Sequence, residues 1–176
     1  LGVFCPGFHL ALIPIATVNF ATYGYDDIIN MWFFSGTTVP GFTALWFSIK
    51  TKSIKGKNIG IPAAISALFG GISEPTTYGI LYKVPVLYIV NTIAGTILAI
   101  YNGIVGTKAY AYGAYYLTNL PLFYSANDPT NLYKALIGIA IVAVVTFIGV
   151  MFTKWEYSED DDAVAAPPTL KLFKKD

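Results

Sequence analysis

Three stretches of the chain carry no charged residue and are separated by short polar segments. They run over 31–49, 84–107 and 135–153, and each contains 19 or more residues. A helix of that length crosses a hydrocarbon core of roughly 30 Å. The pattern therefore predicts an all-α integral membrane protein with transmembrane helices near 31–49, 84–106 and 131–153.

The first 23 residues are apolar, but the run is interrupted by Pro6, Gly7, His9, Pro14 and Asn19. This pattern predicts a broken or tilted helix that lies against protein rather than lipid. The next segment, "YGYDDIIN" at 23–30, is predicted to be a polar turn or a short surface segment. Within 31–49, Gly36, Pro40 and Gly41 are expected to bend the helix.

The segment 61–80, "IPAAISALFGGISEPTTYGI", combines apolar residues with helix breakers around one carboxylate. A straight helix through Glu74 and Pro75 would lose a backbone hydrogen bond and place a charge among apolar groups. Irregular backbone at membrane depth is tolerated where it lines a cavity or is packed in protein. We therefore predict a re-entrant hairpin with Glu74 near its tip, shaped by Gly70, Gly71, Pro75 and Gly79.

The stretch between the last two apolar runs is rich in aromatic residues, with five tyrosines between Tyr110 and Tyr124. Tyrosine favours the interface between membrane and water. This stretch is predicted to be a second, shallower hairpin or an interfacial segment.

Charge clusters at two places suggest an orientation. The lysines at positions 50, 52, 55 and 57 form one short loop, and such loops remain in the cytoplasm. The residues from 154 to 176 are acidic, then rich in Ala and Pro, then basic, which predicts a cytoplasmic tail or linker. With both segments inside, 84–106 and 131–153 supply two crossings, so 61–80 must enter and leave on one side. The domain organisation is thus a membrane-embedded portion, 1–153, and a tail, 154–176.

Composition supports a membrane protein and narrows its chemistry. Hydrophobic residues make up 55% of the chain and charged residues 12%, against about 25% in ordinary soluble domains. All 11 basic residues are lysines and the net charge is +1, so no nucleic-acid partner is expected. Cys5 is the one cysteine, so the chain offers neither a disulfide nor a cysteine metal site, and no metal or cofactor is predicted. The chain begins without Met or a basic leader, as a piece of a longer polypeptide would.

Glu74 is the strongest candidate functional residue. A carboxylate at membrane depth costs on the order of 2.5–3.5 kcal/mol and is by default a functional candidate. It accepts two hydrogen bonds in a fork, which suits adjacent sugar hydroxyls, although a structural role in capping backbone amides is the alternative. His9 is the one histidine, and it gains interest only if it lies with Glu74. Thr76 and Asn19 are polar groups that could line the same cavity or satisfy hydrogen bonds between helices.

The motifs together resemble a known family. "GISEPTTYG", preceded by "ISALFG", is similar to the GITEP-type signature of Enzyme IIC, the sugar-transporting membrane subunit of bacterial phosphoenolpyruvate-dependent phosphotransferase systems. "GFHLALIPIATVNFATYGYD" resembles the histidine-bearing segment of the β-glucoside branch within the glucose superfamily. "KAYAYGAYYLTNLP" is similar to a later Tyr-Ser-Phe-Gly-Leu-Pro stretch. The resemblance runs from about Gly7 to Pro121, in the same order and at compatible spacing.

This resemblance implies a homodimeric all-helical transporter of the bacterial cytoplasmic membrane, with two re-entrant hairpins, of which this chain is the C-terminal, sugar-binding portion. It places the sugar, a β-glucoside, against His9 and Glu74. Thr76 and Thr77 stand where the family usually has Ala-Ile or Ala-Val, and Leu10 replaces a common Trp, which bears on substrate preference. The implied partners are the IIB and IIA components and the upstream phosphocarrier protein.

The chain lacks the Asn-Cys-x-Thr-Arg-type motif of the phosphorylated cysteine, and Cys5 in "VFCPGF" does not fit it. The resemblance therefore implies a permease without a catalytic residue of its own, whose sugar is phosphorylated by IIB. Two alternatives remain open: an ion- or proton-coupled secondary transporter in which Glu74 carries the proton, and a fragment that does not transport.

Overall fold

A computed structural model describes residues 11–113 and 117–157. Its helices are α1 (Ile13–Tyr23), α2 (Ile29–Lys50), α3 (Ile54–Gly70), α4 (Glu74–Thr76), α5 (Pro85–Val105) and α6 (Thr130–Phe152). The π-helical turn η2 (Thr77–Leu81) continues α4, and the 3₁₀ segment η3 (Leu117–Phe123) precedes α6. The described residues contain no strand, only the isolated pairs Asp26–Ala109 and Ser125–Asp128. The predicted all-α class is therefore confirmed for the described part of the chain.

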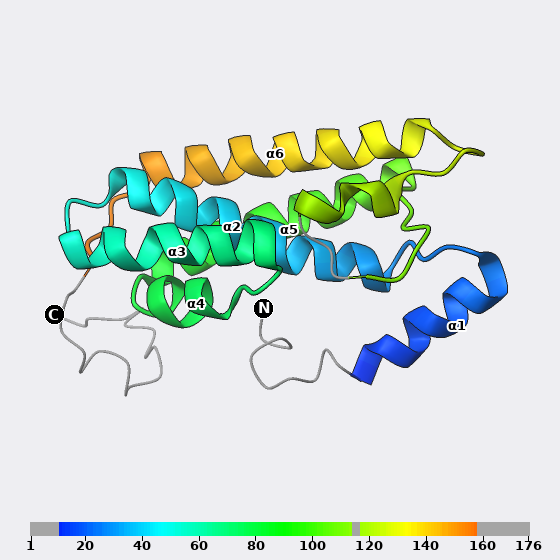
Figure 1. Ribbon diagram of the computed structural model, residues 1–176. Coiled ribbons are helices and arrows are strands. Elements are labelled where there is room, and N and C mark those ends of the chain that lie inside the picture. The colour runs from blue at the N-terminus through cyan, green and yellow to red at the C-terminus, as the bar shows by residue number, and fades with distance from the viewer. Residues whose placement is uncertain (1–10, 114–116, 158–176) are drawn as a thin grey trace, which may run out of the picture.

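The centre of the molecule is formed by α2, α5 and α6, each of which packs against the other two (Figure 1). Two apolar clusters lie along this bundle. One contains Phe34, Leu98 and Val142, and the other contains Phe47 and Leu87. Because both clusters draw on all three helices, α2 is held over most of its length, and it continues as a single helix through Pro40.

Two helices are long and apolar enough to cross a membrane, as predicted for 84–106 and 131–153. They are α5, with 21 residues, and α6, with 23 residues. Only 28% of the most apolar window in each is buried, whereas a core helix of a soluble protein would be mostly covered. Their outward faces carry large apolar side chains, among them Ile89, Ile93, Ile100, Val144, Phe147 and Ile148. A surface of this kind fits a lipid environment.

The third predicted span forms α2, which is not among these two. Its 22 residues include buried Asn30, Thr37, Thr38 and Thr43, and most of its positions face neighbouring helices. The predicted helix at 31–49 is thus present, but its composition is that of a helix enclosed by protein rather than one exposed to lipid.

Lys50 joins the C-terminal ends of α2 and α6. Its ammonium group donates to the carbonyls of Val150 (2.8 Å), Met151 (3.0 Å) and Thr153, and it lies over the Trp155 ring at 5.0 Å from the centroid. Because the final carbonyls of a helix lack intrahelical donors and carry partial negative charge, a lysine here stabilises both helix ends.

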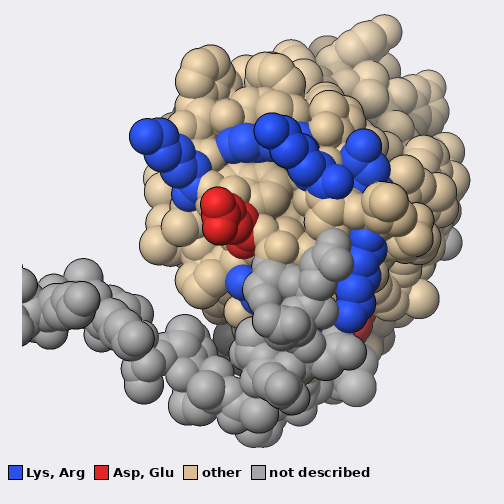
Figure 2. All heavy atoms as spheres, turned by 90° about the vertical axis from the view of Figure 1, so that its left-hand side faces the viewer, with Lys and Arg blue, Asp and Glu red and all other residues tan. Residues whose placement is uncertain are grey.

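We call this end of the molecule the lysine end. It carries Lys50, Lys52, Lys55, Lys57, Lys83 and Lys154, which lie where α2 and α6 end and where α3 and α5 begin. Figure 2 shows the lysines gathered on this face around one acidic patch. At the opposite end, the described residues include two lysines, Lys108 and Lys134, and three aspartates, Asp26, Asp27 and Asp128.

The tyrosine-rich segment is irregular rather than a pair of regular helices. Tyr110 donates its backbone N–H to the carbonyl of Leu122 (2.9 Å), and the ring of Phe123 lies 5.0 Å from that of Phe34. Since η3 contacts both α6 and α3, the segment folds back over the bundle after α5 ends. Whether this loop is a second hairpin within a membrane stays a prediction.

The predicted tail begins with residues that pack on the bundle. The Trp155 ring stacks on Phe47 at 5.1 Å, and the Tyr157 hydroxyl donates to the carbonyl of Gly79 (3.2 Å). Residues 154–157 are therefore part of the folded structure. The rest of the predicted tail, 158–176, lies outside the described residues.

Candidate functional site

The chain reverses direction between α3 and α4 in a tight turn. Gly71 ends α3 in the left-handed conformation, with φ of 71°, and the N–H of Ile72 reaches back to the carbonyl of Ser66 (3.1 Å). The Ser66 hydroxyl donates to the carbonyl of Ile72 (3.1 Å), which closes the turn from both sides. Only glycine adopts this backbone conformation at little cost, so the sequence "GG" stops α3 here.

The second leg of the hairpin packs closely against the first. A Cβ at Gly79 would lie 2.9 Å from Cγ2 of Ile59, so η2 approaches α3 more closely than a larger residue would allow. In Figure 1, α4 runs back beside α3 toward the lysine end. The hairpin therefore starts near Lys55 and returns near Lys83, at the same end of the molecule.

The turn lies about halfway along the bundle. A Cβ at Gly41 would lie 2.5 Å from the Leu68 side chain, so these two positions are in direct contact. Gly41 is near the middle of α2, and Leu68 is two residues before the end of α3. The hairpin thus reaches from the lysine end to about the midpoint of α2, where it places Glu74.

Glu74 begins α4 with its carboxylate exposed. Among the described residues, no hydrogen bond or ion pair joins this carboxylate to another side chain or to a backbone amide. Pro75 follows it at the start of the helix, a position where the missing N–H of proline is not needed. The alternative role of Glu74 as a cap for the hairpin amides is not what the structure shows.

Thr76 lies beside Glu74 in sequence but is fully buried, and its hydroxyl has no hydrogen-bond partner among the described residues. Thr77, in contrast, donates its hydroxyl to the carbonyl of Ser73 (3.1 Å). A buried hydroxyl without a partner is uncommon because it loses its hydrogen bonds to water. The hairpin tip therefore has one exposed free carboxylate above one buried free hydroxyl.

Asn19 occupies a different part of the molecule. Its side chain donates to Oδ1 of Asp26 (2.6 Å) at the end opposite the lysine end, and α1 projects there, away from α4 (Figure 1). The structure does not bring Asn19 together with Glu74. His9 lies outside the described residues, so its position relative to Glu74 stays a prediction.

Asp26 is a buried carboxylate that the sequence pattern did not reveal. It is 0% exposed, and besides the Asn19 amide it accepts the backbone N–H (2.5 Å) and the side-chain amide (2.8 Å) of Asn30. Its backbone pairs with Ala109 in both directions. The prediction that 23–30 is a polar turn or a short surface segment is wrong for Asp26 in one respect, because this residue is buried. A signal existed, since an aspartate shortly before a helix often accepts from its first amides.

The described residues contain no group of three or more His, Cys, Asp or Glu side chains that could hold a metal ion. The two carboxylates at the helix breaks therefore do not form a joint metal site. Asp26 belongs to a hydrogen-bonded cluster, and Glu74 is exposed at the tip of the α3–α4 hairpin.

Comparison with known proteins identifies relatives of one kind. The chain is 29% identical over 123 residues to the "PTS system beta-glucoside-specific EIIBCA component" of Halalkalibacterium halodurans. The aligned region covers 69% of this chain and 19% of that protein. It is 31% identical over 158 residues to the sucrose-specific EIIBC component of Bacillus subtilis, covering 89% of this chain and 33% of that protein. It is 24% identical over 159 residues to the arbutin-, cellobiose- and salicin-specific EIIBC component of Escherichia coli, covering 90% and 33%.

The chain thus spans between about a fifth and a third of the length of these curated relatives. No family model matches the chain, and no solved structure matches it. The chain is a homologue of the sugar-specific components of the phosphotransferase system (PTS) and is consistent with an EIIC portion of the β-glucoside type.

Proposed function

We propose that this chain is the sugar-binding part of a phosphotransferase-system permease, and that its substrate is a β-glucoside. It carries the sugar across the bacterial cytoplasmic membrane while the IIB partner phosphorylates it. The names of several relatives, which specify β-glucosides or arbutin, cellobiose and salicin, support this substrate class. The IIA component and the upstream phosphocarrier protein are further proposed partners, and the complete protein is proposed to be a homodimer.

The observation that carries this proposal is the free carboxylate of Glu74 at the hairpin tip. A carboxylate that makes no hydrogen bond within the described fold can accept two from neighbouring sugar hydroxyls, and charged acceptors form the stronger hydrogen bonds. The partnerless Thr76 hydroxyl, two positions after Glu74 in the chain, is proposed to line the same cavity. His9 is proposed as a second sugar contact, whereas Asn19, which donates to Asp26 at the other end of the molecule, is not part of this proposed site.

The lysine end is proposed to face the cytoplasm, because short lysine-rich loops are retained there. The α3–α4 hairpin would then enter the membrane from the cytoplasmic side and end near mid-depth, as a re-entrant hairpin shaped by Gly71, Pro75 and Gly79, whereas Gly70 is an ordinary helical residue at the end of α3. A sugar bound at the hairpin tip would become accessible from either side of the membrane after a modest movement of the hairpin. The phosphoryl donor then meets the sugar at the lysine end, where phosphoryl transfer requires mainly positioning and electrostatic stabilisation.

The substitution Glu74→Gln tests this proposal, because it keeps the shape of the side chain and removes its charge. Hydrogen bonds to charged groups are worth roughly 1.5–3 kcal/mol and neutral ones about 1 kcal/mol. We expect the Kd for salicin, measured by calorimetry on the purified chain in nanodiscs, to rise about tenfold or more, since about 1.4 kcal/mol is one decade.

Glu156→Gln is the matched control, because Glu156 is also exposed but lies at the lysine end after α6. Its Kd for salicin should equal that of the parent chain. A well-folded Glu74→Gln protein with unchanged affinity for salicin would exclude Glu74 from the sugar site. An equal loss in both variants would mean that general negative charge, rather than this carboxylate, matters.

A further inference from the structure

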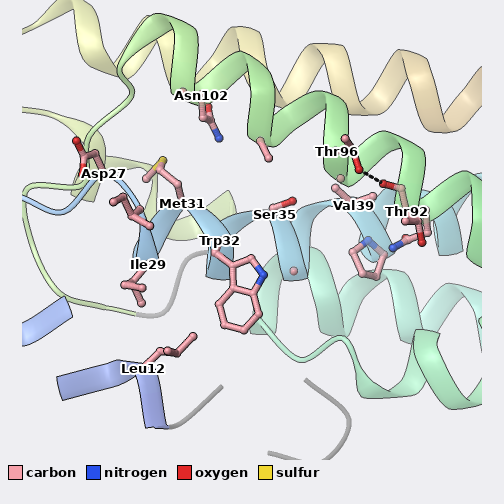
Figure 3. A pocket seen from close by; sticks show the side chains of 17 residues that line it. Leu12, Asp27, Ile29, Met31, Trp32, Ser35, Val39, Thr92, Thr96 and Asn102 are labelled. Atoms are coloured by element: carbon pink, nitrogen blue, oxygen red, sulfur yellow. Dashed lines mark hydrogen bonds between the residues drawn. The ribbon is translucent and has the colours of Figure 1, made fainter. Parts of the chain in front are cut away.

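A groove whose lining does not include Glu74 lies between α2 and α5 in the described structure. It has a volume of about 660 Å³, within the range of roughly 300–1,000 Å³ that is typical of small-molecule sites. Its walls are the first half of α2 and the part of α5 from Asn91 to Gly103, and Leu12 lines one side (Figure 3). Because these walls lie beyond the midpoint of α2, the groove belongs to the end opposite the lysine end.

Asn102 is the most unusual residue of the groove wall. It is 5% exposed, and neither its amide nitrogen nor its amide oxygen has a hydrogen-bond partner among the described residues. In Figure 3 its amide projects from α5 toward the space above Met31 and Trp32. A buried amide with both ends unpaired is rare in a native fold. It can be satisfied from the groove by a ligand that both donates and accepts hydrogen bonds.

Other groove residues are also neutral hydrogen-bonding groups. Ser35 offers a hydroxyl that can donate and accept, and the Thr96 hydroxyl, which donates to the Thr92 carbonyl (2.9 Å), can still accept. Pro40 has no N–H to donate to the Gly36 carbonyl. That carbonyl therefore lacks its usual helical donor, and both residues line the groove. The polar groups therefore match a ligand with several hydroxyls rather than one with a single charge.

The charged residues and the one indole of the groove further restrict the chemical class of ligand that it can bind. No lysine lines the groove and Asp27 is its one charged residue, so a phosphate or carboxylate ligand has no counter-charge there. The Trp32 indole offers a flat apolar face, and in Figure 3 it lies across the groove from α5. The C–H face of a pyranose ring can cover such a surface while its hydroxyls reach Asn102 and Ser35.

A small-residue stripe on α5 has a second interpretation. Gly95, Ala99 and Gly103 follow one another at intervals of four, a spacing that also lets membrane helices approach closely. A docked helix, however, would need to supply its own polar group at Asn102, whose amide has no partner among the described residues. The free amide and the neutral polar lining favour a small polyhydroxylated ligand.

We propose that the groove between α2 and α5 is a second sugar-binding site, separate from Glu74, which receives an uncharged pyranoside at the end opposite the lysine end. The inference rests on the proposed function. On the proposed orientation, this groove opens away from the cytoplasm and loads sugar before it reaches the hairpin tip.

A single reactive thiol in the groove tests this site. Cys5→Ala removes the one native thiol, and Ser35→Cys then introduces one in the groove of the full chain, purified in nanodiscs. The rate of labelling by a maleimide fluorophore is measured across a salicin titration. We expect saturating salicin to slow labelling at least threefold. Ser53→Cys, at the lysine end, is the matched control and should label at one rate throughout.

Two further substitutions separate this site from the hairpin tip. In the Glu74→Gln background, the salicin concentration that gives half-protection at position 35 should remain the same. Asn102→Leu should raise that concentration at least fivefold, while Glu74-dependent binding measured by calorimetry persists. Val142→Ala, which alters the core of α6 outside the groove, controls for loosened packing and should leave protection unchanged.

Several results would overturn the groove site. If Glu74→Gln shifts the salicin concentration for half-protection of position 35 about tenfold, the thiol at position 35 reports only on sugar binding at the hairpin tip. If salicin binds by calorimetry but never protects position 35, the groove proposal fails and the proposed function stands. If salicin does not bind at all, both fail. If position 35 is unreactive with and without salicin and forms a disulfide between two chains, a second copy occupies the groove.

Discussion

Asp26 and Glu74 each follow a left-handed glycine at a break between two helices. Gly24, with φ of 77°, ends α1 two residues before Asp26, and Gly71, with φ of 71°, ends α3 three residues before Glu74. Asp26 is fully buried and accepts three hydrogen bonds, whereas Glu74 is exposed and accepts none from the described residues. Two similar local sequences therefore place the same chemical group in opposite surroundings.

The difference separates a carboxylate that holds the fold from one that is available to a ligand. Asp26 links α1 through Asn19 to the start of α2 through Asn30, so its charge is used within the protein. Glu74 makes no such link, so its removal should cost the fold little. Functional candidates in an apolar chain are thus better ranked by their unused hydrogen-bonding capacity than by their charge alone.

The largest effect is expected for Asp26→Ala, which leaves three donors without an acceptor: two on buried Asn30 and one on partly buried Asn19. Hydrogen bonds to charged groups are worth roughly 1.5–3 kcal/mol each and are not additive, so we expect a loss of about 3 kcal/mol in the free energy of unfolding. The measurement is denaturant unfolding of the purified chain in detergent, followed by circular dichroism at 222 nm.

Two other carboxylates give the contrast. Asp27→Ala removes the exposed neighbour and Glu74→Ala removes the free tip carboxylate, and each should change the free energy of unfolding by less than about 0.5 kcal/mol. If Glu74→Ala destabilised the fold as much as Asp26→Ala, the two carboxylates would share a structural role and the comparison would fail.

The next effect concerns the glycines of the hairpin turn. Gly71→Ala forces a Cβ into the left-handed region and should cost about 1–2 kcal/mol of stability. Gly70→Ala is the matched control, because Gly70 is the last residue of α3, has a negative φ and leaves open space around a new Cβ. It should be neutral or stabilising by up to about 1 kcal/mol. Equal losses at both positions would argue against the turn geometry.

The sequence predicts the apolar helices well because each is a continuous run bounded by charge. The predicted 84–106 and 131–153 differ by one residue at each end from α5 and α6. The hairpin turn was also readable, since Gly71 and Pro75 act through local backbone geometry. Both features depend on residues that are neighbours in the chain.

The features that escaped prediction depend on residues far apart in the chain. Asp26 has nearby side-chain partners in Asn19 and Asn30, but its backbone pairs with the distant Ala109, and "YGYDDIIN" alone has the composition of a surface turn. The groove needs α2 and α5 side by side, about 60 positions apart, so no local pattern indicates it. His9 and Glu74 were paired through resemblance to a family rather than through physical reasoning on the chain.

The smallest effect on stability is expected at Asp128, a carboxylate whose surroundings are intermediate between those of Asp26 and Glu74. It is partly exposed, accepts a hydrogen bond from the Thr130 hydroxyl (2.6 Å) and lies 3.9 Å from the Lys134 ammonium group. The hydrogen bond from Thr130, followed by the charge of Lys134, holds the pKa of the Asp128 carboxyl below its ordinary value, against the opposing effect of partial desolvation.

A carboxyl whose pKa is lower in the folded chain stabilises the fold above its unfolded pKa, near 4, and loses that contribution as the pH falls through the folded value. At pH 6 we therefore expect the parent chain to be slightly more stable than Asp128→Asn, with a difference that shrinks below about pH 4. Thr130→Val removes the principal cause, so in that background the Asp128→Asn difference at pH 6 should be smaller. Thermal unfolding in detergent between roughly pH 3 and pH 6, a range that includes the unfolded pKa near 4, measures both differences. A difference that grows as the pH falls would mean that the charged form of Asp128 opposes folding, and Asp128 would then belong with neither Asp26 nor Glu74.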